Sequence, residues 1–262
     1  MSSLKQLVQD GEYHIALIGN PNNPQPKWPS DPPQEMDVIK LVGNGDSVLG
    51  EYCITSTRIT LIGREVPGGP LGEKYGIVCA ENTKGNSCYT LAGGRLEPSV
   101  NENRLEETTP AEETVLDCLV REVEEELKLS IKTEEVALIG LRTITEDDGS
   151  FRKIRGRICA DACFLGVVDE RLTASSGYRG ETGERMVLPP KTLLARVARG
   201  EKPILPQPQA LALAMAIIAA KDLFGNAMPE PLREIVSENY DYAFRASRRS
   251  RWFNNFISAF QG

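Results

Sequence analysis

Apolar residues along the chain follow two different periods, and the places where the period changes divide it into predicted elements. Runs rich in β-branched and other apolar residues predict strands, because such side chains fit the half-buried surface of a sheet. They occur as "RITLIGREV", "YGIVCAEN" and "CYTLAGGRLE" between residues 58 and 97, and as "EEVALIGLRTITED" and "RICADACFLGVVDE" further along.

Between these two groups of strands, apolar residues recur at helical spacing and form one stripe that faces a core. The stripe consists of Leu116, Leu119, Val120, Val123 and Leu127. We expect this helix to begin with Thr109 as the N-cap, Pro110 at the first helical position and Glu112 completing a capping box.

Three more helices are predicted after the strands. The segment "PPKTLLARVARG" begins with prolines and ends at Gly200, residues 210–224 are almost wholly apolar, and residues 231–260 form the last helical stretch. The order of strands, helix, strands and helices is typical of an α/β fold in which helices pack on a mixed sheet.

Four glutamates crowd the end of the first helix in "REVEEELKLS". Glu122, Glu125 and Glu126 stand at i, i+3 and i+4 and share one face, whereas Glu124 points elsewhere. Like charges at this spacing destabilise a helix by roughly 0.2–0.5 kcal/mol per pair. Two interpretations are open. One is a solvated acidic face in which Arg121 pairs with Glu125, and the other is a set of oxygen ligands for Mg²⁺.

Two glycines, Gly93 and Gly94, end the strand before this helix, and glycine lets a backbone approach a ligand closely. Together with the glutamates they resemble the signature of the Nudix hydrolase family: two glycines, a glutamate, seven residues, then R-E-apolar-x-E-E-x-G-apolar. The matching residues are Gly93, Gly94, Glu113 and the run "REVEEELKL" from Arg121 to Leu129. Thirteen additional residues separate Gly94 from Glu113, and Lys128 replaces the usual glycine. We expect Lys128 to keep the left-handed conformation of that glycine, at a cost of roughly 1 kcal/mol. The alternative is that the helix ends without a left-handed residue.

The resemblance implies a Nudix-type α/β/α sandwich with a mixed β-sheet over residues 57–224. An N-terminal extension would cover residues 1–56, and a C-terminal helical tail residues 225–262. The implied activity is metal-dependent hydrolysis of a pyrophosphate bond in a nucleoside diphosphate linked to a group X. ADP-ribose or a nucleotide sugar is the favoured substrate, and a nucleoside triphosphate is next. The alternative is a Nudix-like module that binds a nucleotide without cleaving it and acts as a regulator.

The resemblance also implies roles for individual residues. The ligands of Mg²⁺ or Mn²⁺ would be the carboxylates of Glu122, Glu125 and Glu126 and the backbone carbonyl of Gly93 or Gly94. Arg121 would orient these carboxylates through Glu113. The general base varies within the family, and the segment "YRGETGERMVLPP" offers Glu181 and Glu184 for this role. The alternative is that both belong to a charged surface loop.

The composition of the chain limits which molecules such a site can bind. With 37 acidic and 30 basic residues the net charge is −7, which does not favour nucleic acid, so a metal would have to offset repulsion of an anionic substrate. The first residues, "MSSLKQLVQD", lack the apolar segment of a secretory signal, and the longest apolar run, "ALALAMAIIAA", is too short to span a bilayer. Six cysteines without a CxxC pair, and a single histidine, predict reduced thiols in a cytoplasmic protein.

The C-terminal segment "FRASRRSRWFNNFISAF" combines arginines with aromatic residues. The favoured interpretation is that it docks on the core or on a second copy of the chain in a homodimer. The alternative is contact with an anionic membrane surface or with RNA.

Overall fold

A computed structural model describes residues 52–65, 74–97, 113–132, 136–146, 150–172, 175–176, 182–224, 226 and 228–249, without residues 86 and 155. It also describes the backbone of residues 16–17, 48–49 and 256–258. Most of the predicted N-terminal extension and the segment that contains Glu181 therefore lie outside the described residues.

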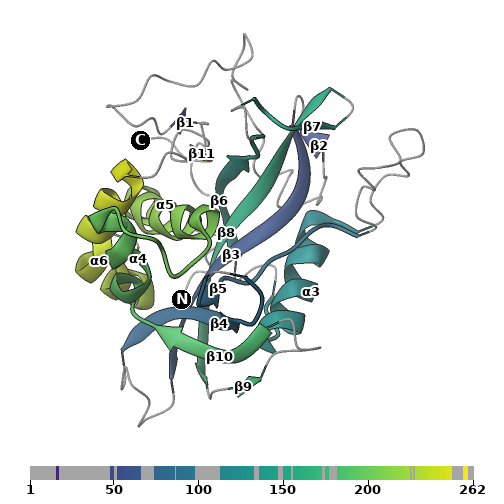
Figure 1. Cartoon of the computed structure of the whole chain (residues 1–262). Coiled ribbons are helices and arrows are strands. Elements are labelled where there is room, and N and C mark those ends of the chain that lie inside the picture. Colours follow the sequence, from purple (N-terminus) through teal and green to yellow (C-terminus); the bar gives the residue numbers. More distant parts are fainter. Residues whose placement is uncertain are drawn as a thin grey trace.

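One mixed sheet organises the described strands, in the order β1-β11-β6-β8-β3-β4-β10-β9 (Figure 1). β2 pairs with β3, β5 with β4 and β7 with β8. The bounds are β1 (Ala16–Leu17), β2 (Val48–Leu49), β3 (Tyr52–Glu65), β4 (Tyr75–Asn82), β5 (Tyr89–Thr90), β6 (Val136–Thr143), β7 (Lys153–Ile154), β8 (Arg157–Leu172), β9 (Ser175–Ser176), β10 (Thr182–Leu188) and β11 (Phe256–Ser258). The two longest strands, β3 and β8, run parallel at the centre, and their described neighbours pair with them antiparallel.

Helices cover both faces of this sheet, as Figure 1 shows. They are α3 (Val115–Leu127), α4 (Pro190–Arg199), α5 (Gln207–Phe224) and α6 (Glu230–Arg249). α3 contacts β3 and β4 on one face, while α5 contacts β3, β6 and β8 on the other. Adjacent residues of β3 point to these two faces, since Thr57 contacts Cys118 of α3 and Arg58 lies opposite Gln209 of α5. The predicted α/β/α sandwich with a mixed sheet is therefore confirmed.

The apolar stripe of α3 fills the space between this helix and the sheet. Leu119, Val123 and Leu127 are fully buried, Leu116 is buried and Val120 is half-buried, so the helical period in the sequence was interpreted correctly. On the other face, α5 is buried along its whole central part because α4 and α6 pack against it. No helix in the described part of the chain has both the length and the apolar character needed to cross a membrane.

The start of α3 differs from the prediction. The helix begins at Val115, and its N-cap is Thr114, whose Oγ1 accepts a hydrogen bond from Asp117 N at 3.1 Å and donates one to Asp117 Oδ2 at 2.6 Å. The cap thus satisfies an N–H group that has no partner within the helix. The prediction that Thr109 and Pro110 begin the helix was wrong, because the sequence "TVLD" supplies a competing cap five residues later.

The last helix is also shorter than predicted. α6 ends at Arg249, and β11 follows within the range that the sequence analysis assigned to a helix. β11 pairs antiparallel with both β6 and β1. Pairing with the backbone groups of β6, which would otherwise form an open edge, outweighs the local helical pattern there. α6 itself packs on α4 and α5 and reaches β4, so this part of the tail docks on the core.

The end of α3 keeps the geometry that the resemblance implied. Lys128 takes left-handed dihedrals, φ 54° and ψ 42°, and its N–H donates to Glu124 O at 3.1 Å. Arg185 of β10 donates from Nη1 to Leu127 O at 2.6 Å and to Lys128 O at 3.2 Å. A buried guanidinium from the sheet therefore caps the helix and fixes the strained residue in place.

Candidate active site

Two glutamates of α3 reach the Gly93–Gly94 turn. This turn is hydrogen-bonded to β3, since Thr57 N donates to Gly94 O. Gly93 N–H donates to Glu126 Oε2 at 2.9 Å, and the carboxylate of Glu122 lies against the Cα of Gly94. The i, i+4 spacing that puts these two carboxylates on one helix face thus also brings both of them to the same turn. The structure brings together the two halves of the motif, although eighteen residues separate Gly94 from Glu113.

The turn requires glycine at both positions. Gly93 has φ +141°, and a Cβ there would overlap the backbone of Thr57 and Arg58. A Cβ on Gly94 would overlap the carboxylate of Glu122. Gly93 therefore allows the turn to lie against the backbone of β3, and Gly94 allows the Glu122 carboxylate to lie against the turn.

Arg121 holds the acidic cluster together. Its Nε donates to Glu113 Oε1 at 2.7 Å and its Nη2 to Glu113 Oε2 at 3.2 Å, which is a two-pronged guanidinium–carboxylate pair. Its Nη1 donates to Glu122 Oε1 at 2.8 Å and to Glu125 Oε2 at 3.3 Å. The predicted orientation of the cluster by Arg121 through Glu113 corresponds to these contacts, and the pairing of Arg121 with Glu125 is present as well.

Glu113 also closes the inserted segment at its two ends. Glu97 N donates to Glu113 Oε2 at 2.7 Å, and Glu113 N donates to Glu97 O at 3.2 Å. The chain therefore leaves the site at Glu97 and returns to it at Glu113 through two hydrogen bonds, so the insertion leaves the register of the motif unchanged.

Burial and the adjacent positive charge shift the pKa of Glu122 in opposite directions. Burial raises the pKa of Glu122 above its ordinary value, and the adjacent Arg121 counteracts part of this rise. The hydrogen bond to Glu113 raises the pKa of Arg121, which stays charged. Burial raises the pKa of the Cys118 thiol, beneath the turn, to about 12, so this thiol is protonated and inert at neutral pH.

The donor set suits a hard divalent cation, although its carboxylates contact protein groups as they stand. Among the described side chains, no group of three or more His, Cys, Asp or Glu residues converges as a metal site. Glu126 accepts from Gly93, while Glu122 and Glu125 accept from Arg121. Carboxylate oxygens that lie against a glycine turn are nevertheless the type of ligand that Mg²⁺ favours. We conclude that the residues fit the ion.

The two carbonyls of the turn differ in their described partners. Gly93 O accepts from Arg58 Nη1 at 2.6 Å, whereas Gly94 O accepts from Thr57 N at 2.8 Å and from Cys118 Sγ at 3.8 Å. A carbonyl oxygen has two lone pairs, so Gly93 O can accept one further interaction.

The remaining predicted site residues lie apart from this cluster. Glu184 of β10 is exposed, and within the described residues no hydrogen bond or ion pair joins it to α3. Glu181 lies outside the described residues, so a role as general base stays a prediction for both. Glu124 is exposed, as expected for a solvated charge.

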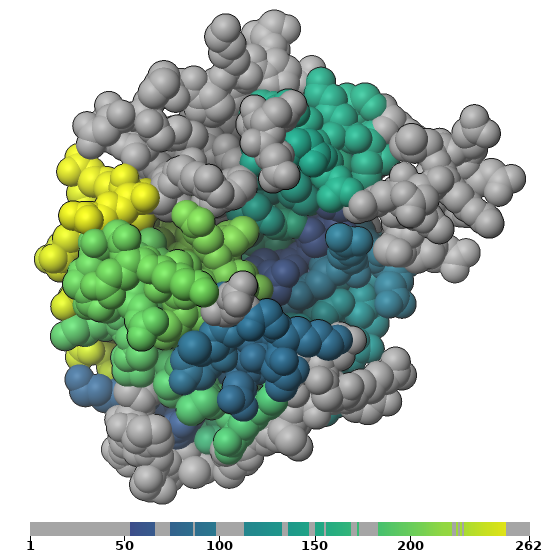
Figure 2. All heavy atoms as spheres, viewed as in Figure 1, coloured from purple at the N-terminus to yellow at the C-terminus, as the bar shows by residue number. Residues whose placement is uncertain are grey.

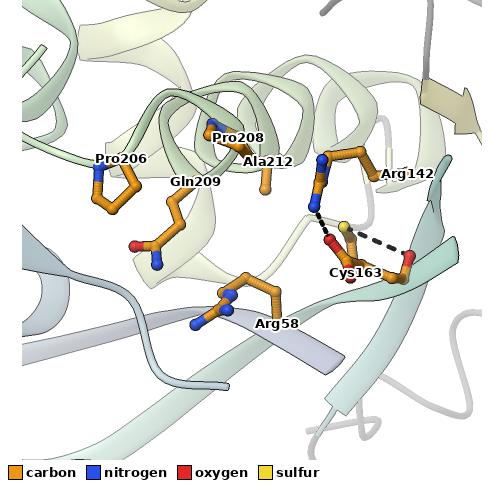
Figure 3. Close-up of a pocket in the computed structure, with 8 residues that line it drawn as sticks. Arg58, Arg142, Cys163, Pro206, Pro208, Gln209 and Ala212 are labelled. Atoms are coloured by element: carbon orange, nitrogen blue, oxygen red, sulfur yellow. Dashed lines mark hydrogen bonds and ion pairs between the residues drawn. The ribbon is translucent and has the colours of Figure 1, made fainter. Parts of the chain in front are cut away.

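A second group of polar residues, which was not predicted from the sequence, lies on the face of the sheet that α5 covers. Arg58, Arg142, Asp161 and Gln209 line a cavity there, together with Cys163, Ala212, Pro206 and Pro208 (Figure 3). Gln209 Oε1 accepts from Leu91 N at 2.7 Å, and Arg58 Nη1 donates to Leu91 O at 2.9 Å. Single charged residues inside otherwise apolar strands were the available signal for Arg58, Arg142 and Asp161.

Among known proteins, the chain is similar to several solved structures. No family model matches the chain, and no curated protein matches it. The chain is similar to the Nudix domain of Shewanella oneidensis NrtR complexed with ADP ribose, at 10% identity over 70% of this chain and 97% of that one, with a TM-score of 0.40. It is similar to a mutT/nudix family protein from Listeria innocua, at 16% identity over 67% and 96%, with a TM-score of 0.35.

A third similar structure is the E. coli dihydroneopterin triphosphate pyrophosphohydrolase, at 13% identity over 63% of this chain and 94% of that one, with a TM-score of 0.37. At these identities and TM-scores the similarities carry no conclusion about chemistry, for which the geometry of the site is the evidence.

Proposed function

We propose that the protein is a metal-dependent pyrophosphohydrolase of the Nudix type, which cleaves a nucleoside diphosphate linked to a group X. The observation that carries this proposal is the meeting of Glu122 and Glu126 with the Gly93–Gly94 turn, next to an arginine that binds two further carboxylates. Clustering acids in this way is unfavourable for an empty helix and favourable once a cation is bound.

Each residue of the cluster has a distinct task in this proposal. Glu122, Glu125 and Glu126, with a carbonyl of the turn, would hold Mg²⁺ or Mn²⁺. The ion supplies neutralisation of charge on the phosphate oxygens and acidifies the attacking water. Arg121 and Glu113 keep the carboxylates in position, because each prong of their pair is a charge-assisted hydrogen bond. Glu125, whose side chain is 46% exposed, is the member that faces the solvent from which substrate arrives.

Within this class, ADP-ribose or a nucleotide sugar is the proposed substrate, and a nucleoside triphosphate is the second choice. Either substrate is anionic, so the chain, with its net charge of −7, needs local positive charge at the site. The cation and the arginines beside the turn provide that charge.

A second candidate function is a module that binds a nucleotide without cleaving it. The observation that favours it is the engagement of all three glutamates by protein groups, two by Arg121 and one by Gly93 N–H. In such a module these contacts would persist when the nucleotide binds, and no ion would replace them.

A screen of nucleoside diphosphate sugars, ADP-ribose and nucleoside triphosphates in Mg²⁺, with identification of the products, separates the two candidates. We expect a nucleoside monophosphate and a phosphorylated X, and no turnover in excess EDTA. Glu125→Gln and Glu126→Gln should each lower kcat by at least ~10²-fold, because each removes charge where electrostatic stabilisation dominates.

Glu124→Gln is the matched control, since Glu124 lies on the same helix but points into solvent, and it should leave kcat unchanged. Binding of a nucleotide without turnover in any metal would favour the module. Wild-type rates in both the Glu125 and Glu126 variants would refute the proposed metal site.

A further inference from the structure

Strand pairing brings charged side chains together at the bottom of the cavity under α5. Arg142 of β6 pairs with Asp161 of β8, and Cys163 of β8 pairs with Arg58 of β3. Asp161 and Cys163 are two residues apart and share a face of the sheet, so all four side chains point to the same side. Figure 3 shows Arg58 and Arg142 on either side of the cavity, beneath α5.

The N-terminal part of α5 and the residue before it form the opposite wall. Pro206, Pro208 and Ala212 give it an apolar surface, and the amide of Gln209 projects beside Arg58 (Figure 3). The cavity has a volume of about 210 Å³. Sites that enclose a whole drug-sized ligand measure about 300–1,000 Å³. This one therefore suits one part of a larger molecule.

The polar lining offers more donors than acceptors. Asp161 is buried, and both of its carboxylate oxygens already accept, Oδ1 from Ser56 Oγ and Oδ2 from Arg142 Nη2. Gln209 Oε1 is taken by Leu91 N, while the guanidinium groups of Arg58 and Arg142 carry donors beyond those used in their described contacts. Two guanidinium groups against one carboxylate leave the cavity with one net positive charge. A group that enters must supply acceptors and gains from negative charge.

The cavity lies next to the acidic cluster, on the other side of one short backbone segment. Arg58 holds Gly93 O from the cavity side, while Glu126 holds Gly93 N–H from the α3 side. In Figure 2, β3 is visible at the bottom of a hollow between the green helices and the teal strands. A molecule bound at the glutamates therefore has a second, positively charged pocket within one peptide unit of the first.

We infer that this cavity, here called the arginine cavity, binds a second anionic group of the substrate, a phosphoryl or carboxylate group beyond the pyrophosphate that is cleaved. The inference rests on the proposed function and deepens it, because it narrows X to groups that carry their own charge. Arg142 is the specificity residue, and its ion pair with Asp161 offsets part of its positive charge. Arg58 contacts both the cavity and the turn.

Binding of inorganic phosphate in EDTA tests the cavity separately from the metal site, since the glutamates repel anions without a cation. Titration of the wild type, followed calorimetrically, should show one phosphate site. Arg142→Gln should weaken it by about tenfold or more, the effect of losing a charge-assisted hydrogen bond. Asp161→Asn should tighten it, because it removes the only negative charge in the lining. Glu124→Gln, which changes an exposed glutamate outside the cluster, should leave it unchanged.

No phosphate binding by the wild type, or equal binding by the wild type and Arg142→Gln, would overturn the inference. If Arg142→Gln does not fold, Asp161→Asn decides alone, and an unchanged or weaker affinity in that variant refutes the charged subsite.

Two substrate pairs identify the anionic group. ATP and ADP differ by a terminal phosphoryl group, and UDP-glucuronate and UDP-glucose differ by a carboxylate. In the wild type, kcat/KM should favour the anionic member of one pair, and Arg142→Gln should remove that preference with little effect on the other member. An equal loss for both members of each pair would overturn the subsite. The proposed hydrolase would still stand, since it is tested by metal dependence and by Glu125→Gln.

Discussion

Lys128 offers a quantitative test of the helix end on which the acidic cluster depends. A residue other than glycine in the left-handed region costs roughly 1–2 kcal/mol. Replacing it with glycine removes this strain but adds roughly 0.4–1 kcal/mol of unfolded-state entropy. It also loses a cation near the helix C-terminus that contributes roughly 0.3–1 kcal/mol. Lys128→Gly alone should therefore raise the free energy of unfolding only slightly.

Comparison with Lys128→Ala isolates the conformational part, because both variants lose the charge and only alanine keeps a Cβ. At this position, with φ 54° and ψ 42°, glycine should be more stable than alanine by up to about 1 kcal/mol. The matched control is Glu124, an exposed residue within the same helix. There the order should reverse, with glycine less stable than alanine by about 1 kcal/mol.

Urea unfolding of the four variants at pH 7 in EDTA, with a common m-value, gives the four free energies. The reasoning is refuted if alanine is more stable than glycine at both positions, because α3 would then end without a left-handed residue. Metal-dependent turnover of Lys128→Gly should equal that of the wild type, since glycine accepts the same dihedrals and leaves the hydrogen bonds from Arg185 to the helix end in place.

Three further changes probe the cluster and its surroundings. Burial raises the folded-state pKa of Glu122, so the stability linked to this group is greatest below its unfolded pKa of about 4.3 and is lost as pH rises through the folded value. Glu122→Gln should therefore raise the free energy of unfolding in EDTA at pH 7, and the gain should shrink towards pH 4. An equal gain at both pH values would contradict this. Glu113→Gln should raise the Mg²⁺ concentration needed for half-maximal turnover, measured by metal titration, because Arg121 loses a charged partner; an unchanged requirement would show that Arg121 needs no such anchor. Iodoacetamide at pH 8 should modify the exposed Cys88 and leave Cys118 unmodified, as detected by peptide mass spectrometry, because burial raises the pKa of Cys118 to about 12; rapid labelling of Cys118 in the folded protein would mean that the turn opens.

Periodicity was sufficient to predict the elements that depend on local burial. The stripe of α3 and the apolar run of α5 are buried as expected, and α4 ends at Gly200 in a left-handed conformation. Two boundaries were wrong, one because of a competing local cap and one because of pairing with a distant strand. α3 begins at the competing cap Thr114, and the end of the chain pairs with β6 as a strand.

The residues of the candidate site also differ in how far the sequence predicts them. The common face of Glu122, Glu125 and Glu126 could be predicted from spacing alone, because i, i+3 and i+4 positions of a helix lie together whatever packs opposite. Their role as metal ligands stays a prediction from the resemblance. Arg58, Arg142 and Asp161 are brought together by the order β6-β8-β3, and the pairing of distant strands is not written in any short stretch of sequence. The arginine that caps α3, Arg185, comes from β10 and was missed for that reason.

The paired hydrogen bonds between Glu97 and Glu113 have a consequence for how this region can change over time. Because the chain departs and returns at neighbouring atoms, the positions of α3 and the glycine turn do not depend on the length of what lies between. Closing a longer loop costs only about 0.6 kcal/mol per doubling. Residues 98–112 can therefore lengthen, shorten or be exchanged for another folded unit without compensating changes in α3 or the glycine turn. New partners or new regulation can be acquired at this junction while the acidic cluster and the turn keep their arrangement.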